Sequence, residues 1–204
     1  MYTINKEVSA SYRDNGSKFI GYLFPALNTD LFDKKLEVIK SQYHDATHHC
    51  YAYRIDPTNI QEFAQDDGEP GGTAGLPILN RLKSAEIVNG GLIVVRYYGG
   101  TKLGKSGLIE AYGYTAKLSI EKADLQSIVP TVNMKITYPY NRQNEIDQLK
   151  STFSLKEMES EYLADVTLTL ACPKSDAQRM IDKLDRLEHL GITYENLGES
   201  FVTQ

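Results

Sequence analysis

The sequence lacks several features that would place it in a specialised class of proteins. Its 204 residues include no tryptophan and only two cysteines, Cys50 and Cys172. Two cysteines this far apart predict reduced thiols and not a disulfide framework. No apolar run approaches the ~20 residues that a membrane-spanning helix needs, and residues 1–7 lack the apolar core of a secretory signal. We therefore expect a cytoplasmic protein without membrane contact.

The chain also lacks an excess of basic charge. It has 22 Lys and Arg against 27 Asp and Glu, for a formal net charge of -5. A protein that wraps duplex DNA by bulk electrostatics is expected to be basic. Residues 134–204 are the more acidic part, with eight basic and twelve acidic side chains. Any contact with nucleic acid must therefore come from a local patch.

What is present is the composition of an ordinary soluble globular chain, with 41% hydrophobic and 24% charged residues. Period-two and helical apolar patterns predict an α+β first domain. In order, the expected elements are strands at 7–13 and 19–24 around a turn at 14–16, a capped helix at 28–43, a strand at 47–55, a short helix that buries Leu76, Leu79 and Leu82, a strand at 91–98, and a helix carrying Leu108 to Leu118.

A domain boundary is expected near Pro130, between residues 127 and 133. The elements that follow are in the order strand, helix, strand, strand, helix, strand, which is the order of the ferredoxin-like split βαβ fold. We therefore predict two domains, at residues 1–130 and 131–204.

A glycine-rich loop at residues 99–106 matches the phosphate-binding pattern G-x-x-x-x-G-K-[ST]. In a nucleotide hydrolase, Lys105 would reach the outer phosphates and Ser106 would hold magnesium. However, no apolar strand ends in an Asp that could serve as the second magnesium-holding element, and few βαβ units are available for a parallel sheet.

A weaker interpretation of the same loop is an anion site. Residues 91–107 carry Arg96, Lys102 and Lys105 and no acidic residue, and a glycine-rich helix start presents backbone amides to phosphate. Alternatively, the glycines only shape a tight strand-to-helix turn. The candidate anion-binding residues are Arg96, Gly99, Gly100, Thr101, Lys102, Gly104, Lys105 and Ser106.

A second glycine-rich loop, at residues 66–75, holds Asp66, Asp67 and Glu69. Three carboxylates this close could bind a hard cation. Alternatively, they accept backbone N–H bonds within a turn, and Thr73 caps the next helix. Because both glycine-rich loops open helices of one domain, we expect them to adjoin and form one functional edge.

A polar cluster is expected around the strand at 47–55, with His44, His48 and Cys50 as its members. On a strand, His48 and Cys50 share one face and His49 lies on the other. A zinc site would need a second pair of ligands, and no such pair is nearby in sequence. We predict no metal site.

Several of these stretches together resemble the IMPACT/YigZ family. They are the HDATHHCYAY segment at 44–53, the loop at 66–75, the VVRYYGGTKLG segment at 94–104, and Gly107-Leu108 with Ala111-Tyr112. The resemblance covers nearly the whole chain.

The resemblance implies a first domain similar to the second domain of ribosomal protein S-five, with a left-handed βαβ unit. It implies a second domain similar to the last domain of elongation factor G. Eukaryotic members of the family act in translational control, by competing for the activator of a kinase that phosphorylates an initiation factor. Members need not keep the Lys105-Ser106 pair, which makes the nucleotide-loop match accidental.

Together, these observations predict a translation-linked protein that binds RNA, the ribosome or a translation-control protein, without catalytic residues or cofactor. Two alternatives remain. One is an enzyme or nucleotide hydrolase that holds a phosphorylated ligand on residues 99–106. The other is a protein-binding adaptor without nucleic-acid contact.

Overall fold

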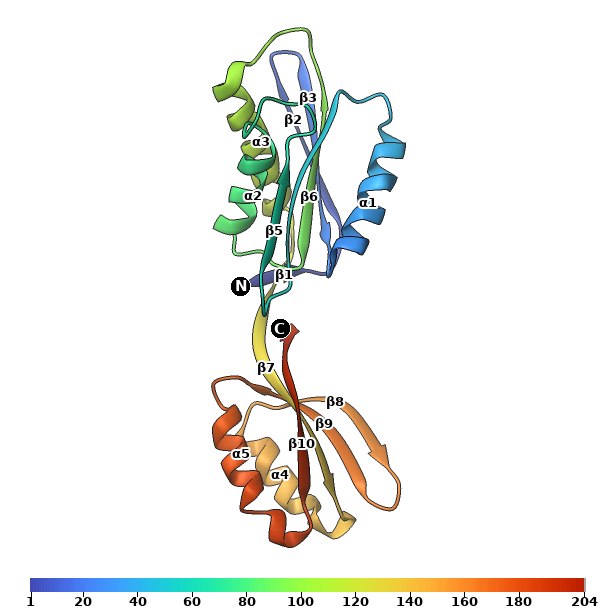
Figure 1. The fold of residues 1–204 in the computed structure, drawn as a ribbon, viewed down its shortest axis with the longest axis vertical. Helices are drawn as coiled ribbons and strands as arrows, with labels where there is room; N and C mark the ends of the chain where they lie inside the picture. Colours follow the sequence, from blue (N-terminus) through green and yellow to red (C-terminus); the bar gives the residue numbers. More distant parts are fainter. Residues whose placement is uncertain (204) are drawn as a thin grey trace. The chain divides into compact units, whose positions relative to one another are not determined.

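The chain forms two compact units, Met1–Ser127 and the residues from Ile128 onward, in a computed structural model that describes residues 1–203. Both units are α+β (Figure 1). The sequence predicted the domain boundary at residue 130. The predicted and the observed boundaries both lie within one strand, β7 (Leu125–Tyr138). No helix in residues 1–203 is long and apolar enough to cross a membrane.

The first unit is built on a five-stranded sheet in the order β2-β3-β6-β4-β5, and every neighbouring pair is antiparallel. Its strands are β2 (Val8–Asp14), β3 (Ser17–Pro25), β4 (His48–Ile55), β5 (Gln61–Gln65) and β6 (Gly90–Tyr97). A short strand, β1 (Tyr2–Ile4), pairs with the beginning of β7.

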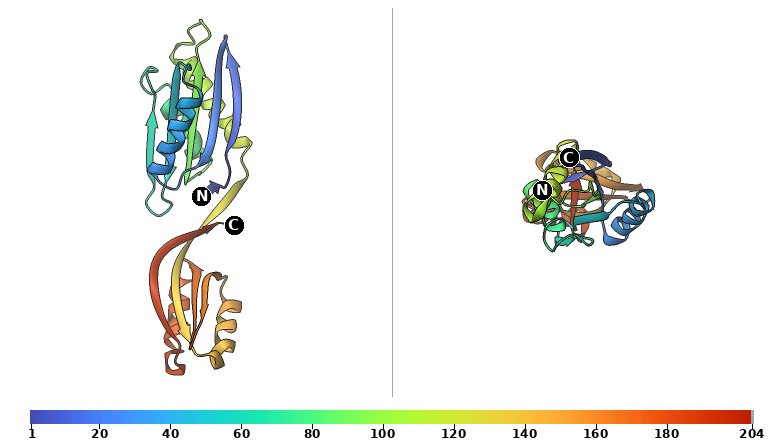
Figure 2. Two further views of the ribbon diagram at one scale, coloured as in Figure 1. Left: turned by 90° about the vertical axis from the view of Figure 1, so that its right-hand side faces the viewer. Right: turned by 90° about the horizontal axis from the view of Figure 1, so that it is seen from above.

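Helices cover both faces of this sheet. α1 (Thr29–Gln42) lies on one face, and α2 (Gly75–Ser84) and α3 (Gly104–Glu121) lie on the other (Figures 1 and 2). The central strand β6 alternates between two cores: Leu92 and Val94 pack towards α2 and α3, while Ile93 and Val95 pack towards α1. β6 is therefore buried on both of its faces.

Three details of the first unit differ from expectation. β5 was not predicted, because its residues are mostly exposed and show no apolar alternation. Leu76 is 50% exposed, because Ile78, Leu79 and Leu82 form the buried face of α2. α3 begins at Gly104, inside the expected loop, so that Lys105 and Ser106 lie on its first turn.

The second unit is a four-stranded antiparallel sheet in the order β10-β7-β9-β8. Along the chain, β7 is followed by α4 (Gln143–Thr152), β8 (Lys156–Tyr162), β9 (Val166–Pro173), α5 (Ala177–Asp185) and β10 (Thr193–Thr203), with short 3₁₀ turns at Tyr140–Arg142 and Glu188–Leu190. This chain order and strand order are those of the ferredoxin-like fold, as predicted.

One face of the second sheet carries both helices. The residues of its core come from alternate positions of β7 and β9 and from the inner faces of α4 and α5; they include Met134, Ile136, Leu168, Leu170, Ile146, Leu149, Met180 and Leu184. This core is separate from the cores of the first unit.

Candidate functional site

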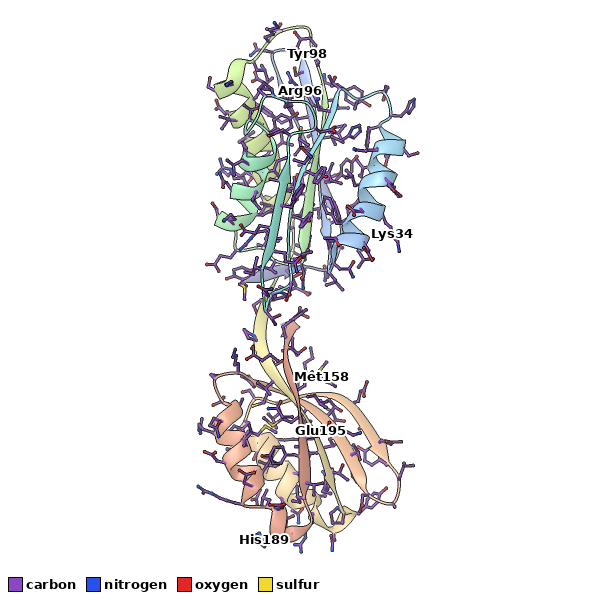
Figure 3. All side chains as sticks on the ribbon, viewed as in Figure 1. Lys34, Arg96, Tyr98, Met158, His189 and Glu195 are labelled. Carbon is purple, nitrogen blue, oxygen red and sulfur yellow. The ribbon has the colours of Figure 1, made fainter. Side chains whose placement is uncertain are left out.

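Strand register brings two predicted site residues, Arg96 and His48, onto one row of the first sheet together with Phe19. Phe19 of β3 pairs with Arg96 of β6, which in turn pairs with His48 of β4. Directly paired residues in an antiparallel sheet project to the same face. Figure 3 shows Arg96 and Tyr98 together near the end of β6. Arg96 and His48 of this row both contact the acidic loop at residues 66–75.

Arg96 forms a buried ion pair with Glu69 of the acidic loop. Arg96 is 4% exposed and Glu69 is 9% exposed, and Arg96 Nη1 donates to Glu69 Oε1 at 2.5 Å. The guanidinium also lies between two rings, 5.4 Å from the centroid of Phe19 and 5.5 Å from that of Tyr98. Arg96, expected to contact an external anion, thus directs its charge at a carboxylate of its own chain.

The Glu69 carboxylate joins a chain of buried polar groups. Its Oε1 also accepts a hydrogen bond from Tyr112 at 2.8 Å, and His48 Nε2 lies 3.9 Å away. Cys50 Sγ lies 3.2 Å from the Tyr112 hydroxyl. Burial raises the pKa of both the Cys50 thiol and the Tyr112 hydroxyl above their ordinary values. Both groups therefore stay protonated and neutral near pH 7.

His44 does not join this cluster. It lies exposed in the turn before β4, whereas His48 and Cys50 face the acidic loop: His48 Nδ1 is 2.8 Å from the Asp67 carbonyl, and Cys50 Sγ is 2.9 Å from the Asp66 carbonyl. His49 faces the other way and reaches the Tyr43 carbonyl, as the strand pattern predicted.

Asp66 organises the acidic loop and the start of α2. Its carboxylate accepts hydrogen bonds from the backbone N–H groups of Gly72, Ala74 and Gly75 at 2.8–2.9 Å. The role of helix cap, expected of Thr73, therefore belongs to Asp66, since the Thr73 hydroxyl donates to the Pro70 carbonyl instead. Burial of Asp66 opposes ionisation, but the three N–H donors outweigh it and lower the pKa of the carboxyl.

The remaining acid of the loop is also engaged by the protein. Asp67 accepts a hydrogen bond from the backbone N–H of His49 at 2.7 Å. All three carboxylates of the loop thus have protein partners. Within residues 1–203, no group of three or more His, Cys, Asp or Glu side chains is arranged to hold a metal ion.

The two glycine-rich loops meet at a cleft, which we call the loop cleft. It has a volume of about 360 Å³ and is lined by Glu69, Pro70, Arg96, Tyr98, Lys102, Leu103, Gly104, Lys105 and Leu108. The expectation that the loops adjoin is confirmed by this lining. Residues 99–102 and 104–106 are all exposed, so the candidate residues other than Arg96 are accessible.

The N-terminus of α3 opens onto the loop cleft without a capping side chain. Its N-cap residue, Leu103, makes no side-chain cap bond, and the first turn contains no acidic residue. The first N–H groups of a helix lack partners within the helix, and they carry the positive end of the helix dipole. Lys102 and Lys105 add positive charge at the same place.

A close approach of two backbone segments, at Gly16 and Gly99, fixes the start of the 99–106 loop. A Cβ on Gly99 would overlap the Gly16 carbonyl and the Ser17 nitrogen, so only glycine fits at residue 99. The Ser17 hydroxyl accepts a hydrogen bond from the Gly99 N–H at 3.1 Å and lies 3.3 Å from Arg96 Nη2. The turn between β2 and β3 therefore holds the start of the 99–106 loop.

Sequence reasoning missed Ser17 and Tyr112 as members of the site. Ser17 follows a turn signal, Asn15-Gly16, that identifies a hairpin but not the strand beside it. Tyr112 lies on α3 at core spacing, where a buried tyrosine is expected to need a partner for its hydroxyl. The partner, Glu69, is 43 residues away in sequence.

The structure gives the 99–106 loop a different context from that of a nucleotide-binding loop. β6 lies between β3 and β4, and both pairs are antiparallel. Phosphate-binding loops of nucleotide hydrolases follow strands of a βαβ unit with parallel neighbours.

Residues 15–120 match the profile of the Impact N-terminal domain, and residues 136–187 match a domain of unknown function (DUF1949). The chain belongs to the IMPACT family. The first match contains the loop cleft and the buried Arg96–Glu69 pair.

IMPACT family members from bacteria are similar over much of this chain. Family member YigZ of Escherichia coli is 32% identical over 170 residues, which cover 82% of this chain and 83% of that protein. Family member YvyE of Bacillus subtilis is 34% identical over 144 residues, covering 70% and 66%. A solved structure, titled a hypothetical protein, has a TM-score of 0.65 at 28% identity and covers 95% of each chain.

Proposed function

We propose that this chain acts in translation by binding the phosphate groups of RNA, on or off the ribosome, at the loop cleft. The observation that carries the proposal is the exposed, uncapped N-terminus of α3, flanked by Lys102 and Lys105 and free of acidic residues in its first turn. Backbone N–H groups and lysines are the usual contacts to phosphate oxygens.

The buried Arg96–Glu69 pair supports this role without contacting the ligand. Glu69 offsets the charge of Arg96, so the exposed positive charge of the loop cleft comes from Lys102, Lys105 and the helix dipole. The Arg96 guanidinium lies against the ring of Tyr98, which is 46% exposed. An aromatic ring held in this way can stack on an unpaired base.

Family membership supports the link to translation. The resemblance described above implies translational control for eukaryotic relatives, and a cytoplasmic site of action follows for a protein of this kind. The net charge of -5 is consistent with a local contact and not with coating of a nucleic acid.

The test is co-sedimentation of the purified full chain with ribosomes, and separately with labelled single-stranded RNA, over a range of salt concentrations. We expect binding that weakens steeply with salt. The variant Lys102→Gln/Lys105→Gln should lower the slope of log K against log salt by ~1.4, because each lost phosphate contact on a single strand contributes ~0.7.

The control is Lys6→Gln/Lys34→Gln, which removes the same charge from exposed positions and should leave the slope unchanged. Equal effects of both variants would show a non-specific charge effect and refute the assignment to the loop cleft. Binding of a protein partner that is indifferent to salt would favour an adaptor, and stabilisation by ATP or GTP with magnesium that is lost in Lys105→Ala would favour a nucleotide-binding enzyme.

A further inference from the structure

A second concentration of positive charge lies in the second unit. A groove of about 470 Å³ is formed where the end of α4 meets α5. We call it the α5 groove; it is lined by Thr152, Phe153, Arg179, Asp182, Lys183, Arg186 and Leu187. This unit is otherwise the acidic part of the chain.

The basic residues of the α5 groove form one stripe along α5 and its end. Arg179, Lys183 and Arg186 are spaced four and three residues apart, which places them on one helix face. The stripe spans ~10 Å at a rise of ~1.5 Å per residue. That length allows contact with more than one phosphate of a nucleic-acid strand.

Phe153 holds two of these cations in place. The Arg179 guanidinium lies 5.6 Å and the Lys183 ammonium 5.9 Å from the centroid of its ring. The Lys183 ammonium also donates to the Thr152 hydroxyl at 3.1 Å. The ring of Phe153 therefore positions both cations along the α5 groove.

Most other basic side chains of this unit are neutralised by neighbours. Arg142, Lys150 and Lys174 form ion pairs with Glu145, Glu157 and Glu199. In the α5 groove, Arg179 pairs with Asp176, but Lys183 and Arg186 form no ion pair with any carboxylate in residues 1–203. Asp182 lines the groove and accepts a hydrogen bond from Gln178. The groove thus retains unbalanced positive charge.

We propose that the α5 groove is a second binding site for the phosphate groups of an RNA backbone. The inference rests on the proposed function, because it takes the same class of ligand. Two of the three cations are arginines, whose planar guanidinium can bind phosphate oxygens in a bidentate manner.

The composition of the α5 groove favours RNA over an acidic protein. Protein interfaces are centred on exposed aromatic or aliphatic anchors. Phe153 is only 5% exposed, and no large hydrophobic side chain of α5 is exposed. Phosphate recognition needs no such anchor, since it depends on charge and tolerates interfacial water.

The test measures the salt dependence of binding of the full chain to labelled single-stranded RNA. We expect Lys183→Gln/Arg186→Gln to lower the slope of log K against log salt by ~1.4, and Arg186→Gln alone to lower it by ~0.7. The control, Lys135→Gln/Lys156→Gln, removes the same charge from exposed positions that do not line the α5 groove. This control should leave the slope of log K against log salt unchanged. Arg186 is exposed and forms no ion pair in residues 1–203, so the single variant is expected to fold normally.

Each outcome separates this site from the loop cleft. A reduced slope in the α5 variants supports the inference even if Lys102→Gln/Lys105→Gln has no effect, which would overturn only the loop-cleft site. Unchanged slopes in the α5 variants, with an effect of the loop variant, overturn the inference alone. Polyaspartate, measured in parallel, represents an acidic protein partner. Loss of polyaspartate binding but not of RNA binding in the α5 variants would overturn the inference in favour of such a partner.

Discussion

Glu69 is the residue on which the polar centre of the first unit depends. Its Oε1 accepts hydrogen bonds from both Arg96 and Tyr112, and the carboxylate is as buried as a core side chain. A buried ion pair is not itself a large source of stability, but loss of one partner leaves an uncompensated charge. Substitutions at this pair should therefore be strongly coupled.

We expect Glu69→Ala to lower the free energy of unfolding by ~3–5 kcal/mol, because the Arg96 charge would remain buried without its partner. The double variant Glu69→Ala/Arg96→Met removes both charges and should recover a large part of this loss. Urea unfolding of the two single variants and the double variant gives the coupling. Additive losses would show that the two side chains do not stabilise each other.

The two cysteines are expected to be unreactive in the folded protein. Burial raises the pKa of the Cys50 thiol, and it raises that of the Cys172 thiol to about 11. Only the thiolate is the nucleophile. Iodoacetamide at pH 8 should label both residues slowly in the native chain and rapidly in urea, as followed by mass spectrometry. Fast native labelling of Cys50 would contradict the buried hydrogen-bonded thiol.

At the residue scale, sequence reasoning found the right segments but not the pairing between them. It selected Arg96 and Glu69 as members of two loops and assigned Arg96 to an external anion. The sequence reveals charge and spacing, but not that β6 places Arg96 beneath the acidic loop. Lys102 and Lys105 are exposed, as an anion site requires, and their binding role stays a prediction.

At the scale of elements, α2 depends on a carboxylate that lies outside the helix. Asp66 accepts hydrogen bonds from the N–H groups of Ala74 and Gly75 at the start of α2 and from that of Gly72 in the loop before it, which is the contribution that a capping residue makes. Its lowered pKa means that the folded state favours the ionised form. This stabilisation is complete above the ordinary pKa of 3.8 and is lost as the pH falls through the lower pKa of the folded state.

We expect Asp66→Ala to destabilise the first unit by ~1 kcal/mol, the usual cost of losing a helix cap. The variant should also show a weaker loss of stability between pH 4 and pH 2, since it lacks the titrating group. Thermal unfolding of the two proteins across this range measures the difference. Asp30→Ala, in the exposed first turn of α1, is the matched control and should keep most of the pH dependence. A pH dependence that is the same in Asp66→Ala as in the unmodified chain would contradict the assignment.

Elements with strong periodicity were predictable and those without it were not. Asn28 caps α1 through its side chain, and in β9 the apolar residues Val166, Leu168 and Leu170 alternate with threonines. β5 is exposed at four of its five residues and shows no apolar alternation, so its pairing with β4 could not be predicted from the sequence. α3 begins at a glycine with positive φ, which helix signals in the sequence do not identify.

At the scale of the whole molecule, the two units have separate hydrophobic cores. Leu92 is fully buried in the first unit and Met134 in the second. Truncation of either residue to alanine creates a cavity at a cost of ~2–5 kcal/mol. The cost should be confined to the unit that contains the cavity.

We therefore expect hydrogen exchange in Met134→Ala to accelerate in β9, α4 and α5 but not in β3, β4 or α3. Leu92→Ala should show the reverse pattern. Native-state hydrogen exchange followed by mass spectrometry distinguishes the two. Equal acceleration throughout both variants would mean that the two units open as a single cooperative structure.

The contact between Gly16 and Gly99 has a practical consequence for work on this protein. Exposed hairpin tips are usually tolerant places for an added peptide or a fluorescent label. Here, the tip at residues 15–16 touches the backbone that begins the 99–106 loop. Residues inserted at this tip would displace the backbone at the start of the 99–106 loop, so a label is better attached elsewhere. We also expect natural differences in the length of this hairpin to be rare.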